Sequence, residues 1–107
     1  MRKPKLGGRT MREQRLVETK QVSTECGEEL QLEYYLTSKD SVEEEGKVYG
    51  ICIKNHRMDR IETDVVENIS YKEEQVLEFV HILSENTVTP ICMAEILDDL
   101  ITERMYS

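Results

Sequence analysis

The chain has 107 residues, of which 38% are hydrophobic and 34% charged, and it carries a net charge of −8. This length is typical of one domain that buries a core without the help of disulfides or metal ions. The three cysteines include no Cys-x-x-Cys pair that would indicate a disulfide or zinc framework. The longest nearly apolar run, about eight residues, is too short to span a bilayer, and the basic N-terminus lacks the apolar segment of a secretory signal. The sequence therefore predicts a single cytoplasmic domain.

Positive charge is concentrated at the N-terminus. Residues 1–20 hold seven Lys or Arg and two Glu, a net charge of +5, while the rest of the chain has seven basic and twenty acidic residues, a net charge of −13. Residues 1–14 lack an apolar period, so we predict a disordered arm before a single domain at 15–107. The arm either solubilises the chain or binds an anion or nucleic acid weakly through its cations, which are Arg2, Lys3, Lys5, Arg9 and Arg12.

Four segments alternate apolar and polar residues, the pattern of half-buried strands. The alternation is weak at 15–23, clearest at 30–37, and returns at 47–55 and 60–67. Short polar connections join these segments, apart from an exposed acidic loop at 38–46, and no helical crossover lies between them. We therefore expect an antiparallel meander.

The C-terminal third predicts two helices. Ser70 and Glu73 have the spacing of a capping box, so the first helix should begin at Ser70 and end near Asn86, a residue type that tolerates the left-handed conformation. Thr89 and Pro90 should begin the second helix as N-cap and first helical residue. Each helix has one apolar stripe: Val76, Phe79, Val80 and Leu83 in the first, and Met93, Ile96, Leu97, Leu100 and Ile101 in the second.

The short connection between these helices predicts an antiparallel hairpin, with Val88 and Met93 placed to form a hydrophobic staple. Stripes this wide need a further surface to cover. The predicted fold is therefore α+β, a four-stranded antiparallel β-meander followed by a two-helix hairpin packed on one sheet face.

Three short segments carry a resemblance. They are Leu-Glu-Tyr-Tyr-Leu at 32–36, Tyr-Gly-Ile at 49–51, and Asn-Thr-Val-Thr-Pro at 86–90 followed by Ile-Leu-Asp-Asp-Leu-Ile at 96–101. Together they resemble a family of roughly hundred-residue clostridial proteins known only as a domain of unknown function. The resemblance covers about residues 15–103 and implies no activity and no functional residues.

Residues that commonly carry chemistry are scattered. Cys26, Cys52, His56, His81 and Cys92 lack the paired spacings of zinc sites, although Cys52 and His56 could approach across a turn. The simpler interpretation is that the cysteines are small core residues and His56 a loop side chain. His81 shares a helix face with Glu74, Glu78 and Glu85, an ordinary surface arrangement of i and i+4 pairs. We expect no catalytic residue, metal or cofactor.

The outer face of the second helix is acidic, with Glu95, Asp98, Asp99 and Glu103. It either docks a basic partner or is simply solvated, and it should repel duplex DNA. The leading hypothesis is a non-enzymatic protein-interaction or regulatory module that uses the exposed sheet face or this acidic face. The alternative is a nucleic-acid-associated factor held by the basic arm. An enzyme would require Cys52, His56 and an acidic residue in one cleft, and a homodimer could form through sheet edges.

Overall fold

The computed structural model describes residues 12–41 and 46–105, which form four strands followed by two helices. The strands are β1 (Glu13–Ser23), β2 (Glu29–Asp40), β3 (Lys47–His56) and β4 (Ile61–Ser70), and the helices are α1 (Glu73–Glu85) and α2 (Pro90–Met105). The sheet has the order β1-β2-β3-β4, and all neighbouring strands are antiparallel. The predicted α+β fold is confirmed.

Several boundaries differ from those predicted. β1 begins at Glu13, inside the predicted arm, because Glu13 and Gln14 pair with Ser38 and Thr37 of β2. β2 likewise continues to Asp40, into the predicted loop. Arg2, Lys3, Lys5 and Arg9 of the arm, and the loop glutamates 43–45, lie outside the described residues.

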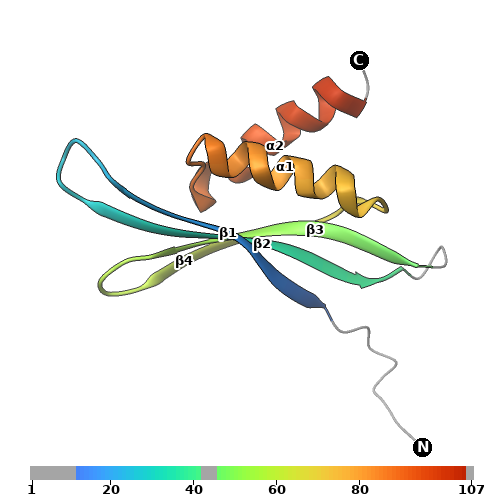
Figure 1. Ribbon diagram of the computed structural model, residues 1–107, viewed down its shortest axis with the longest axis horizontal. Coiled ribbons are helices and arrows are strands. Elements are labelled where there is room, and N and C mark those ends of the chain that lie inside the picture. The colour runs from blue at the N-terminus through green and yellow to red at the C-terminus, as the bar shows by residue number, and fades with distance from the viewer. Residues whose placement is uncertain (1–11, 42–45, 106–107) are drawn as a thin grey trace, which may run out of the picture.

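Both helices lie on one face of the sheet (Figure 1). α1 contacts all four strands, whereas α2 contacts β3 and β4. The buried residues on this face come from alternate strand positions, from the predicted helix stripes and, with Val88, from the connection between the helices: Leu30, Leu32, Tyr34, Leu36, Ile51, Ile53, Val76, Phe79, Val80, Leu83, Val88, Met93 and Leu97. Ile96, Leu100 and Ile101 of the second stripe are only partly buried against this core.

The predicted capping box at Ser70 is wrong. Ser70 is the last residue of β4, and α1 begins at Glu73 after the N-cap Lys72, whose side chain makes no capping hydrogen bond. The Ser70 hydroxyl instead accepts a hydrogen bond from the Lys72 backbone N–H at 3.1 Å and donates to Gln75 Oε1 at 2.7 Å. Pairing of Ser70 with Tyr49 of β3 extends the strand, so the helix begins two residues later than predicted.

The connection between the helices forms as predicted in position but not in detail. Asn86 is the C-cap, with a φ of −95°, and the residue in the left-handed region is Thr87, with a φ of 52°. α2 begins at Pro90, as the sequence predicted. The carbonyl of Val88 accepts a hydrogen bond of 2.9 Å from the buried Tyr34 hydroxyl, which fixes this connection to the centre of the sheet.

Each edge strand contains an irregularity. In β1 the register shifts between Leu16 and Glu18, and in β4 the residues opposite Gly50 bulge, with Asn68 at a φ of 60°. Gly50 is needed at this point because a Cβ there would lie 2.4 Å from the Val66 carbonyl oxygen. Bulges of this kind increase the local twist of the strand.

Candidate functional site: the uncovered face of the sheet

The face of the sheet opposite the helices is not covered by any described element (Figure 1). One row of apolar or aromatic side chains crosses it, because Leu16 pairs with Tyr35, Tyr35 with Cys52, and Cys52 with Val65. We call these four residues the apolar row. Leu16 is 48% exposed and Cys52 is 1% exposed, so the row is accessible to solvent at the β1 edge and buried at its centre.

A polar cluster lies beside the apolar row. Glu33 Oε1 accepts hydrogen bonds from the Tyr35 hydroxyl at 2.7 Å and from His56 Nε2 at 2.8 Å. The hydrogen bonds from His56 and Tyr35 hold the pKa of Glu33 below its ordinary value, and the Glu33 carboxylate raises the pKa of Tyr35 to about 12. The Lys54 ammonium lies 5.0 Å from the centre of the Tyr35 ring, in cation–π contact.

A second charged group lies on the other side of the row. Glu67 on β4 forms ion pairs with Arg12 at 2.5 Å and with Lys39 of β2 at 3.2 Å. These two cations hold the pKa of Glu67 below its ordinary value. Arg12, assigned to the arm by the sequence, is therefore held against the opposite edge strand.

The two sides of the molecule differ in charge. On the uncovered face Arg12, Lys39 and Lys54 are matched by Glu29, Glu33 and Glu67, a net charge of 0 with neutral histidine. Residues 72–105, which form the helix layer, contain two basic and eight acidic residues, a net charge of −6. The predicted docking residues Glu95, Asp98, Asp99 and Glu103 are all exposed on α2.

A shallow hollow of ≈ 160 Å³ lies beside the polar cluster. Its lining includes Gln31, Glu33 and His56, but not Cys52. Cys52 and His56 both lie in β3, so they do not approach each other across a turn. They are four positions apart along the strand, which is about 13 Å at 3.3 Å per residue.

The other candidate residues also have definite places. His81 is exposed, and its Nδ1 contacts Glu18 of β1 rather than a glutamate of its own helix. Glu78 of α1 pairs with Arg104 of α2 at 2.9 Å. Cys26 and Cys92 are exposed, so of the three cysteines only Cys52 is the buried residue that the sequence predicted.

Lys20 was not singled out from the sequence. Its ammonium donates to the carbonyl oxygens of Ser84 at 2.8 Å and Glu85 at 3.5 Å, the last residues of α1. No cation lies in the last turn of α1 itself, so a strand residue supplies the positive charge that a helix C-terminus favours. Nothing in the local sequence of either segment indicates this contact.

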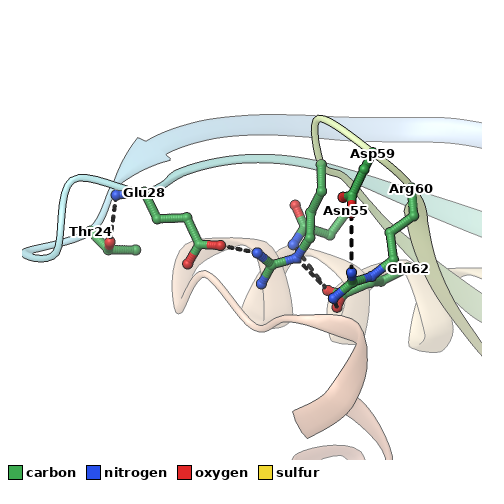
Figure 2. A network of polar contacts seen from close by, with 7 residues as sticks. Thr24, Glu28, Asn55, Asp59, Arg60 and Glu62 are labelled. Atoms are coloured by element: carbon green, nitrogen blue, oxygen red, sulfur yellow. Dashed lines mark hydrogen bonds and ion pairs between the residues drawn. The ribbon is translucent and has the colours of Figure 1, made fainter.

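A polar network joins the tips of the two hairpins (Figure 2). Arg57, after β3, contacts Glu28 of the β1–β2 turn, and its Nε lies 3.2 Å from Oε1 of Glu62. Arg57 first, and the Asn55 amide next, hold the pKa of Glu62 below its ordinary value. The network connects the two hairpins, and the Arg57 guanidinium already contacts the carboxylates of Glu28 and Glu62.

Within residues 12–41 and 46–105, no three His, Cys, Asp or Glu side chains are placed to hold a metal ion together. In the same ranges no helix has the length and apolarity required to cross a membrane.

The chain was compared with protein families, curated proteins and solved structures. The model of a family described as "Family of unknown function (DUF6514)" matches residues 13–103. No curated protein and no solved structure matches the chain.

Proposed function

Since the chain belongs to the DUF6514 family, a family of unknown function, we propose from its surface chemistry that it is a protein-interaction module. Its recognition surface is the uncovered sheet face. The observation that carries the proposal is the apolar row, which crosses all four strands and ends at Leu16, 48% exposed. Apolar side chains rimmed by paired charges are typical of protein-binding surfaces.

The acidic face of α2 is a weaker candidate for the same role. Exposed carboxylates on a helix are well solvated, and surface ion pairs contribute little to affinity. Removal of an apolar row from water lowers the free energy and therefore favours binding. We therefore place the partner on the sheet and treat the acidic face as a contribution to solvation and to long-range steering.

The proposal can be tested by capture of partners from native cell extract on the immobilised full chain. Leu16→Glu places a charge in the apolar row and should abolish capture, because a buried unpaired carboxylate strongly disfavours binding. Ile91→Glu is the matched control, since Ile91 is also an exposed apolar residue, 80% exposed, but lies on α2. Circular dichroism of each variant confirms that the fold is retained.

The sheet face would not be the recognition surface if Leu16→Glu and Ile91→Glu lost the same captured proteins, or if neither variant lost any. Loss after Asp98→Lys with Asp99→Lys, and not after Leu16→Glu, would transfer the role to the acidic face of α2.

The nucleic-acid alternative rests on the basic arm. Of its cations, Arg12 is already paired with Glu67, and the other four lie outside the described residues. Deletion of residues 1–11 leaves β1 intact, so binding to random-sequence RNA at low salt with and without these residues tests this alternative directly. Binding that requires residues 1–11 and falls steeply with salt would support it.

A further inference from the structure

We infer that the partner of the uncovered face is a second copy of this chain, which docks its own uncovered face to form a two-fold homodimer with both helix layers outside. This inference rests on the proposed function and names the partner. It follows from the size of the face, the symmetry of the apolar row and the distribution of charge.

The face has the size that a stable dimer needs. Four strands about 4.8 Å apart give a width of about 19 Å, and ten to twelve residues at about 3.3 Å each give a length of about 33–40 Å. The footprint is then about 600–750 Å² per copy, close to the roughly 800 Å² per partner of a standard interface.

The apolar row is self-complementary. Consider two sheets that face each other, related by a two-fold axis that lies in the plane midway between them. If the axis runs parallel to the strands, Leu16 of one copy faces Val65 of the other; if it runs perpendicular to the strands, Leu16 faces the second Leu16. In both cases the apolar row of one copy lies against the apolar row of the other. Facing sheets pack about 10 Å apart, so these side chains interdigitate.

Charge favours this face over the rest of the surface. Most of its charged groups have a partner within each copy: Glu67 pairs with Arg12 and Lys39, Glu33 accepts hydrogen bonds from Tyr35 and His56, and Lys54 lies over the Tyr35 ring. Contact between two copies therefore buries few charges that have no partner. Contact through the helix layers would bring two layers of net charge −6 together. Face-to-face docking places those layers as far apart as the fold allows.

The sheet edges are a poorer route to a dimer, although the sequence suggested them. β1 and β4 both contain bulges, and bulged edge strands pair poorly with another chain.

A substitution at the centre of the sheet distinguishes a dimer formed through the uncovered face from one formed through the sheet edges. Lys54 of β3 lies on the uncovered face and not at an edge.

The test is sedimentation equilibrium of the full chain, 12.5 kDa, over a range of concentrations up to about 200 µM. Wild type and Ile91→Glu should sediment as dimers, whereas Leu16→Glu and Lys54→Glu should each raise the dimer dissociation constant by at least about tenfold. Raising the salt concentration should strengthen the wild-type dimer, because it screens the repulsion between two chains of net charge −8.

Each other result overturns the inference. A wild type that is monomeric throughout excludes self-association, and if Leu16→Glu still abolishes partner capture, the proposed function stands with a different partner. A wild-type monomer that dimerises after deletion of residues 1–11 shows that this segment occupies the face. A dimer weakened by Leu16→Glu but not by Lys54→Glu is paired through its edges.

Discussion

The two faces of the sheet are built from the same strands but from different chemistry. On the helix-covered face the central side chains Tyr34, Ile51 and Ile53 are fully buried and meet apolar helix residues. On the opposite face Tyr35 and Cys52 share the central strands with Lys54, Glu33 and paired charges.

The difference indicates that the helix-covered face stabilises the fold and that the uncovered face is available for recognition. Burial of large apolar side chains supplies most of the free energy of folding, so it is concentrated where the helices pack. The uncovered face contributes less, and its residues can therefore be changed without unfolding the chain. Four experiments would sharpen or break this comparison.

The largest effect is expected from Phe79→Ala in α1. Phe79 is fully buried between α1 and the sheet, and its removal leaves a cavity in the core. The free energy of unfolding should fall by about 3–5 kcal/mol in urea titration. Leu16→Ala on the uncovered face is the matched control and should cost less than about 1 kcal/mol. Equal losses would mean that the two faces contribute alike to stability.

A smaller effect is expected when one of two neighbouring tyrosine hydroxyls is removed. Tyr34→Phe removes the 2.9 Å hydrogen bond to the Val88 carbonyl in the core and should cost about 1–2 kcal/mol. Tyr35→Phe removes a bond to the partly exposed Glu33 and should cost less. Burial, and then the nearby Glu18 charge, raise the pKa of Tyr34 to about 12, so ultraviolet titration should show this hydroxyl ionising well above pH 10.

Lys20→Met tests the contact between β1 and the end of α1. Methionine keeps most of the apolar stem but loses the ammonium that binds the carbonyl oxygens of Ser84 and Glu85. The expected loss is about 1 kcal/mol in thermal or urea unfolding, with faster hydrogen exchange in the last turn of α1. Gln21→Met, an exposed neighbour on the same strand, provides the control and should leave that turn unchanged.

The weakest effect is the loss of stability in acid. Glu33, Glu62 and Glu67 have pKa values lowered from 4.5 by their hydrogen-bonded partners. Their stabilisation is fully present above the unfolded value and is lost as the pH falls through the lowered folded values, because the unfolded chain then binds more protons. Glu67→Gln should flatten the decline of the unfolding free energy below about pH 4.5, measured by urea titration at several pH values. An unchanged slope would show that the ion pairs with Arg12 and Lys39 do not persist in solution.

Local patterns predicted the elements well. Alternation located all four strands, the helical stripes identified the residues that α1 buries, and Thr89 with Pro90 located the start of α2. Each of these signals depends only on residues close together in the chain. The errors occurred where a distant segment competes with a local preference. Ser70 stays in β4 because it pairs with Tyr49, and Glu13 joins β1 because it pairs with Ser38.

By itself, then, the sequence determined the order of the elements, the antiparallel meander and the acidic helix layer, since periodicity, turns and charge are local properties. Only the tertiary structure decided the contacts that define the surfaces. Glu67 with Arg12 and Lys20 with Ser84 join residues more than 50 positions apart. Their encounter depends on the twist and register of the whole sheet, and so does the alignment of Leu16, Tyr35, Cys52 and Val65 into one row.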